Sequence, residues 1–144
     1  MTAKHYLSQL RKLDNLIEAR KEALKRMRQE ETYITGISYD SVRVQTSTVD
    51  TGFKRSEEQA DKEAELLRLI RKLQDKRNLI LDQISLLDNP VHVEVLIDRY
   101  VYYHSFEEIA DRIHRSYVRT THIHGDALRR FDEILRNSTS DDKT

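Results

Sequence analysis

The stretch "SFEEIADRIHRSYVRTTHIHGDALRRF", residues 105–131, decides the fold of the C-terminal part of the chain. Ser105 and Glu108 have the spacing of a capping box, which marks the start of a helix. Apolar residues follow at helical spacing: Phe106, Ile109, Ala110 and Ile113. After a short break, a longer helix is predicted from Ser116 to about Arg136, with inward positions Thr120, Ile123, Ala127, Phe131 and Ile134. A short helix, a tight turn and a second amphipathic helix are typical of a helix-turn-helix.

A third short helix precedes this pair. In "LLDNPVHVEVL" (residues 86–96), Asn89 is a favourable N-cap and Pro90 suits the first helical position. The predicted helix 90–102 has an apolar face of Val93, Leu96, Ile97 and Tyr100. Residues 89–137 are therefore expected to form a three-helix unit. The polar residues 138–144 are expected to be a disordered tail.

The first 88 residues are expected to form a long antiparallel helical hairpin with coiled-coil spacing. Apolar stripes run along residues 1–33 and 56–88 in alternating steps of three and four. The first segment has eight Lys/Arg against five Asp/Glu and the second has six against eight, a bias that suits mutual packing. Pairing the ends brings Ile17 near Leu73 and Leu10 near Ile80.

Each stripe contains one arginine, and two interpretations of them are open. Arg20 and Arg77 either fix the register of the pair, with Asp14 near Arg77, or lie at the edge of the stripe with their charged ends in water.

The connection 34–55 is rich in Ser, Thr and Val and lacks helical periodicity. It is predicted to be a long loop, with a short β-hairpin around "VRVQTSTV" as one candidate conformation.

The composition excludes several classes of protein. Of the 144 residues, 35% are charged and 7% aromatic, with three glycines and one proline, which favours an all-α chain of water-facing helices. There is no cysteine, so disulfides and thiolate metal sites are excluded. The N-terminal residues form no apolar run of signal-peptide or membrane-span length. We expect a cytoplasmic protein that does not bind membranes.

The histidines near the start of helix 116–136 raise the question of a metal site. On a helix, His122 and His124 are about 200° apart around the axis, whereas two ligands on one helix need spacings of three or four. No Ser, Cys or paired carboxylate stands at a spacing suited to catalysis. We therefore expect no metal, no cofactor and no enzymatic activity. His124 should lie beside the apolar stripe and His122 on the outer face.

The outer face of this helix has a local excess of positive charge. Between residues 115 and 131 there are four arginines and one acid, Asp126. Arginine reads guanine edges, Thr and His reach base edges, and flanking arginines hold phosphates. The predicted DNA-binding residues are Arg115, Ser116, Tyr117, Val118, Arg119, Thr121, His122, Arg129 and Arg130. From periodicity alone, a solvated helix or one that docks on an acidic protein is equally open.

"EEIADRIHRSYVRTTHIHGDALRRF" resembles the C-terminal helix-turn-helix of bacterial primary sigma factors, roughly EEIGKxLGVSxxRVRQIExxALxKL. The match has no gap and includes Glu107, Glu108, Ile109, Ser116, Arg119, Ile123, Ala127, Leu128 and Arg129. The resemblance implies that Tyr117, Val118, Arg119, Thr121 and His122 face the upstream promoter hexamer. His114 replaces the turn glycine, Arg115 an apolar residue and Thr120 a core valine. Tyr117, Thr121 and His122 also differ from the sigma residues, so we expect any DNA sequence read to differ from the standard element.

Four segments spread along the chain have a further resemblance: "AKHYLSQLRKLD", "RVQTS", "LDNP" and "HIHGDAL". In this order they resemble a family of small phage-encoded proteins of Gram-positive bacteria, which end in a sigma-like helix-turn-helix. The arrangement is similar to that of phage regulators of late and autolysin-type genes. The resemblance implies transcriptional control in the host bacterial cell.

The expected function is that of a phage-type DNA-binding transcriptional regulator. Residues 90–137 carry seven Lys/Arg and eight Asp/Glu, so a monomer should bind double-stranded DNA modestly. The hairpin is expected to form a homo-oligomer, most simply a dimer, or to contact host RNA polymerase. The alternatives are a packaging component similar to a small terminase subunit, and an adaptor or inhibitor that does not bind DNA.

Gly125 lies inside the predicted DNA-reading helix, where Gly is about 1 kcal/mol less favourable than Ala. Two interpretations are open. Either a side chain at this position would strike the DNA backbone or a neighbouring helix, or the position is a tolerated weak spot.

Overall fold

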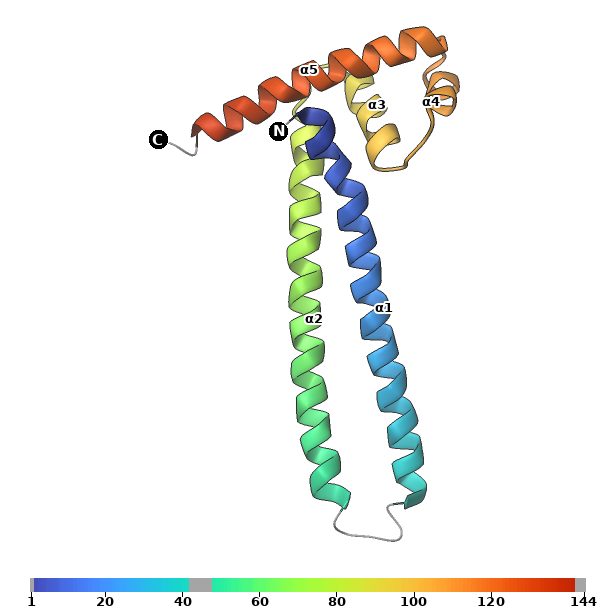
Figure 1. Ribbon diagram of the computed structural model, residues 1–144, viewed down its shortest axis with the longest axis vertical. Helices are drawn as coiled ribbons and strands as arrows, with labels where there is room; N and C mark the ends of the chain where they lie inside the picture. The colour runs from blue at the N-terminus through green and yellow to red at the C-terminus, as the bar shows by residue number, and fades with distance from the viewer. Residues whose placement is uncertain (1, 42–47, 142–144) are drawn as a thin grey trace. The chain divides into compact units, whose positions relative to one another are not determined.

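In this computed structural model, the described residues form five α-helices and no strand. The backbone is described for residues 2–41 and 48–141, and the side chains for residues 2–30 and 57–141. The helices are α1 Ala3–Ser41, α2 Thr48–Ile84, α3 Pro90–Tyr100, α4 Phe106–Ile113 and α5 Tyr117–Asp141 (Figure 1). The prediction of an all-α chain is confirmed for these residues. None of these helices is apolar over a length sufficient to cross a lipid bilayer.

The two long helices extend further than predicted. Most of the expected loop 34–55 is helical, because α1 continues to Ser41 and α2 begins at Thr48. Ser, Thr and Val disfavour a helix by less than about 1 kcal/mol each, and lengthening an existing helix needs no new nucleus. The candidate β-hairpin falls on residues 42–49. Of these, 42–47 lie outside the described residues, and Thr48 and Val49 belong to α2.

The C-terminal segment also differs from the prediction. The expected disordered tail begins at residue 138, but α5 continues to Asp141. The hydroxyl groups of Ser138 and Ser140 donate to the carbonyls of Ile134 and Arg136, at 3.0 Å each. These hydroxyls thus find acceptors within the helix, which makes a helical end compatible with this polar sequence. Residues 142–144 lie outside the described residues.

The chain forms two compact units, residues 1–14 with 75–144 and residues 15–74. This division differs from the predicted boundary between residues 88 and 89. The reason is that the first turns of α1 and the last turns of α2 share a buried core with α3, α4 and α5.

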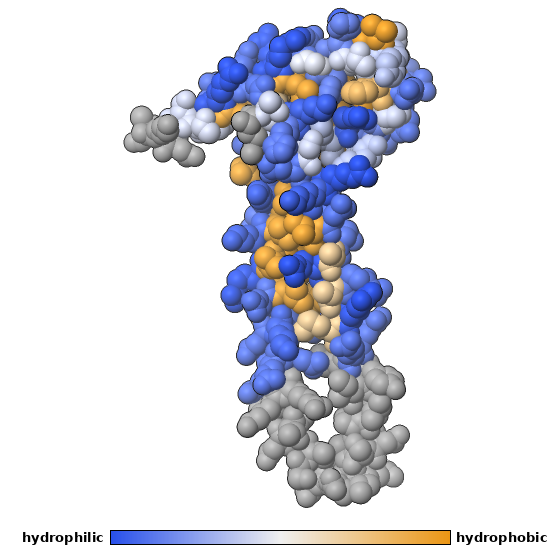
Figure 2. Space-filling model, in the orientation of Figure 1, coloured by the Kyte–Doolittle hydropathy of each residue, from blue (hydrophilic) through white to orange (hydrophobic). Residues whose placement is uncertain are grey.

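In the unit 15–74, the segments of α1 and α2 run antiparallel, side by side (Figure 1). The buried side chains include Ile17, Leu24 and Ile70. Figure 2 shows hydrophobic side chains along the line between the two helices, with hydrophilic side chains on either side. Arg20 is exposed, as expected for a position at the edge of the stripe.

The unit of residues 1–14 and 75–144 has a core to which all five helices contribute. Its most deeply buried side chains include Leu7, Leu10, Ile80, Ile84, Leu96, Ile109 and Phe131. The ring of Tyr6 lies 6.0 Å from that of Phe131, and the Tyr6 hydroxyl donates to Gln83 Oε1 at 2.5 Å. The amide of Ala3, at the start of α1, donates to Asp132 Oδ1 of α5 at 2.9 Å. These contacts join segments that are far apart in the sequence.

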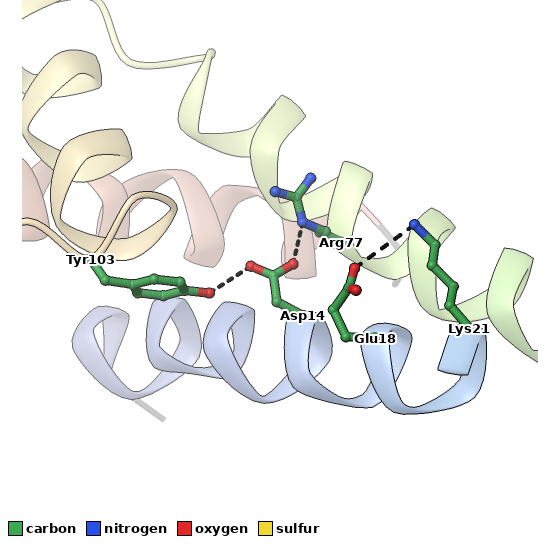
Figure 3. Close-up of polar contacts among 5 residues, drawn as sticks. All are labelled: Asp14, Glu18, Lys21, Arg77 and Tyr103. Carbon is green, nitrogen blue, oxygen red and sulfur yellow. Dashed lines mark hydrogen bonds and ion pairs between the residues drawn. The ribbon is translucent and has the colours of Figure 1, made fainter. Parts of the chain in front are cut away.

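In the same unit, Asp14 accepts hydrogen bonds from two directions (Figure 3). Arg77 Nε donates to Asp14 Oδ1 at 2.5 Å, which confirms the predicted proximity of these residues. The Tyr103 hydroxyl donates to Asp14 Oδ2 at 2.5 Å. Burial and this hydrogen bond raise the pKa of Tyr103 to about 12, so its hydroxyl keeps the proton that it donates. Asp14 therefore connects α1 and α2 to the loop between α3 and α4.

Candidate nucleic-acid interface

A small apolar core holds α3, α4 and α5 together. Val95, Ile109 and Ile123 form its buried centre, and Val91, Phe106 and Ile113 pack against them. The prediction for helix 90–102 overlooked Val95, which is fully buried, and included Val93, which is only half-buried. The reason is that α3 contacts both α4 and α5, so it buries more than the single face that the periodicity predicted.

Helices α3, α4 and α5 begin at the residues that the sequence indicated. Asn89 Oδ1 accepts from the amide of Val91 at 3.0 Å, and Ser105 Oγ accepts from that of Glu108 at 3.2 Å. Ser116 Oγ accepts from the amide of Arg119 at 3.1 Å, at the start of α5. Each side chain thus satisfies an amide that has no partner within its own helix.

The turn between α4 and α5 has the geometry that glycine usually provides. His114 adopts the left-handed conformation, with φ 56° and ψ 47°, and the amide of Arg115 donates to the carbonyl of Ala110 at 3.0 Å. This is a Schellman ending for α4. A non-glycine residue in this conformation costs about 1 kcal/mol. The replacement of the sigma-type glycine by His114 therefore leaves the turn intact.

Thr120, which stands where the sigma pattern has a core valine, is also accommodated. Thr120 is fully buried, and its hydroxyl donates to the carbonyl of Ser116 at 2.8 Å. A buried hydroxyl without an acceptor would be costly, and this hydrogen bond supplies one within α5.

The first two turns of α5 present an exposed face. Tyr117 is 50% exposed and Val118 62%, and Arg115, Ser116, Arg119 and His122 are also exposed. Thr121 is half-buried, and its hydroxyl donates to the carbonyl of Val118 at 2.7 Å. The structure therefore brings together seven of the nine predicted residues.

The arginines of this segment fall into two groups. Within the described part of the chain, no acid lies within ion-pair distance of Arg115 or Arg119. Arg129 pairs with Asp126, and Arg130 Nη1 lies 3.5 Å from Glu133 Oε2. Arg129 lies on the same side of α5 as Val118 but about 16 Å further along its axis. Arg129 and Arg130 are thus separate from the face at the start of α5.

The two histidines of "HIHGDAL" have different surroundings, as predicted. His122 is exposed, whereas His124 is half-buried, with its Nε2 2.9 Å from the Tyr100 hydroxyl and its ring 5.0 Å from that of Phe106. Burial, and then the positive charges of Arg99 and Lys4, lower the pKa of His124 to about 4. His124 is therefore a neutral packing residue at pH 7. No three side chains of His, Asp or Glu converge as metal ligands in the described residues.

The sequence analysis did not predict a buried carboxylate in α3. Asp98 of α3 is only 2% exposed, and its Oδ2 lies 3.3 Å from Arg112 Nε of α4. Its backbone carbonyl accepts from the amide of His104 at 2.9 Å. Asp98 thus holds the loop that leads into α4. The visible signal was an acid directly after the apolar run Val95, Leu96 and Ile97.

The exposed guanidinium groups at the start of α5 are groups that can bind an anion. The face combines the guanidinium groups of Arg115 and Arg119, which have no ion-pair partner among the described residues, with the hydroxyls of Ser116 and Thr121, the imidazole of His122, and Tyr117 and Val118. The Ser116 cap and the apolar core hold this end of α5. The chain matches no protein-family model, and no curated protein or solved structure is significantly similar to it.

Proposed function

We propose that the protein is a DNA-binding transcriptional regulator in which α4, the turn at His114 and α5 act as a helix-turn-helix. The first turns of α5 would enter the major groove of double-stranded DNA. The observation that carries this proposal is the exposed face at the start of α5, where Arg115 and Arg119 have no acidic partner among the described residues. A cation that is solvated and unpaired loses no internal contact when it binds a phosphate or a base.

The side chains have distinct roles in this proposal. Arg119 reads a guanine through two hydrogen bonds, and Arg115 contacts a phosphate. Ser116 adds a phosphate contact, while Thr121 and His122 reach base edges. Arg129 and Arg130 contact phosphates further along the DNA. Their ion pairs with Asp126 and Glu133 do not prevent this, because exposed ion pairs are worth only about 0–1 kcal/mol and are readily exchanged.

The balance of charge indicates that one copy binds weakly. The seven basic and eight acidic residues of 90–137 leave no net attraction for DNA. We infer that α1 and α2 act as a helical hairpin that forms a dimer or contacts host RNA polymerase in the bacterial cytoplasm. Either partner would add phosphate contacts and raise the effective concentration at the site.

Selection of DNA fragments by the purified full chain tests this proposal. Fragments should be selected at two salt concentrations by the wild type, by Arg119→Ala and by Arg68→Ala. Arg68 is an exposed arginine of α2. Arg68→Ala therefore removes the same charge as Arg119→Ala, but at a position outside α5. We expect the wild type and Arg68→Ala to enrich one motif. Arg119→Ala should bind it about 5- to 150-fold more weakly, from about 1–3 kcal/mol per bidentate contact. Equal affinity of the two variants would contradict the role of Arg119.

The balanced charge also favours a second candidate, a packaging component similar to a small terminase subunit, in which many copies together hold DNA. Mass measurement of the purified protein distinguishes the two. A ring of eight or more subunits with salt-sensitive binding and no motif would support packaging, and a monomer or dimer would support the regulator. Absence of DNA binding at both salts would instead indicate an adaptor that binds a protein.

A further inference from the structure

Val118 is an exposed apolar residue on the polar face at the start of α5. Its side chain is 62% exposed, whereas its neighbour Tyr117 is held by an edge-on contact of its ring with Phe106, at 6.3 Å. Val118 is flanked by Arg119, which has no ion-pair partner in the described residues. A single aliphatic side chain between two exposed arginines, Arg115 and Arg119, offers too little apolar area to bind an apolar protein surface. It suits a polyanion that has an apolar group within reach.

We propose that Val118 recognises the methyl group of a thymine in the major groove, which makes it a residue that determines DNA specificity. This inference rests on the function proposed above. Thymine is the only base that presents an apolar group in the major groove, its C5 methyl, and a valine can form no hydrogen bond with a base edge. On a helix, valine has one strongly preferred side-chain conformation, so little freedom is lost when it makes this contact.

The position of Val118 agrees with this role. It lies in the first turn of α5, where recognition helices contact base edges, and Ser116 and the Schellman turn at His114 hold that turn in place. A selected site should therefore contain a thymine whose methyl group contributes to affinity, close to the guanine read by Arg119.

The test is a double-mutant cycle between protein and DNA. In the motif enriched by selection, each thymine is replaced in turn by deoxyuridine, which lacks only the methyl group. Binding by the wild type, Val118→Ala and Val118→Thr is then measured, with deoxyuridine outside the motif as a control. One buried methyl group corresponds to about a fourfold change in affinity. At one thymine, the wild type should lose about fourfold, Val118→Thr less, and Val118→Ala nothing measurable.

Two results would overturn the inference while the regulator proposal stands: equal losses for the wild type and Val118→Ala, or no loss for the wild type at any thymine. Because Val118 is exposed, its replacement should leave the fold intact, and circular dichroism of the variants checks this. If the wild type enriches no motif, the proposed function fails and this inference fails with it.

Discussion

At the scale of single residues, the environment of a side chain decides its chemistry. His122 and His124 are two positions apart, yet one is exposed and the other lies against Tyr100 and Phe106. The same holds for the arginines, since Arg119 has no acidic partner in the described residues while Arg129 pairs with Asp126. The function proposed for α5 depends on these differences rather than on composition.

His124 should make stability depend on pH. Because its folded-state pKa of about 4 lies below the ordinary value of 6.5, the unfolded chain binds the proton more readily. The stability that comes from neutral His124 is therefore fully present above pH 6.5 and is lost as the pH falls towards 4. In His124→Gln, the amide can still form a hydrogen bond with the Tyr100 hydroxyl but does not titrate. Urea unfolding from pH 7 to pH 4 should show a steeper loss for the wild type. If the free energy of unfolding depended on pH equally in the wild type and in His124→Gln, the lowered pKa would be contradicted.

Gly125→Ala should stabilise the fold. A Cβ placed on Gly125 meets no described atom within 4 Å apart from the adjoining backbone of α5, so α5 gains the higher helix propensity of alanine, about 1 kcal/mol. Among the described residues, no neighbouring helix is therefore close enough to require glycine at position 125. Urea unfolding measures the gain, and a loss of stability would contradict it. Affinity for selected DNA then separates the remaining interpretations, because weaker binding would indicate close approach of the DNA backbone.

At the scale of helices, local signals determined where each element begins. Loss of the N-cap in Ser116→Ala should lower the free energy of unfolding by about 1 kcal/mol. Ser140→Ala is a suitable control, because Ser140 is exposed near the end of α5 and caps no helix start; it should change stability by less than about 0.5 kcal/mol. Equal effects of the two substitutions would show that Ser116 does not act as a cap.

At the scale of the whole molecule, residues 1–14 and 75–141 form one unit through contacts between distant segments. Asp132 of α5 accepts from the amide of Ala3, a buried residue. Asp132→Ala should lower the free energy of unfolding by about 1–3 kcal/mol, because that amide loses its acceptor. Asp132→Asn should lower it by only about 0.3–1 kcal/mol, because it keeps an acceptor and loses a charge near the start of α1. Urea unfolding measures both, and an effect of Asp132→Ala as small as that of the exposed Glu133→Ala would contradict this contact.

The sequence by itself determined the all-α class, the helix starts at Asn89, Ser105 and Ser116, and the proximity of Asp14 and Arg77. These follow from caps and periodicity, which act over a few residues and can be read directly. Only the tertiary structure decided that Val95 and Asp98 are buried, that α1 and α2 extend into the expected loop, and that α1 begins against α5. Which helix faces meet depends on packing between segments far apart in the chain. The periodic pattern of one helix does not show which other helix packs against it.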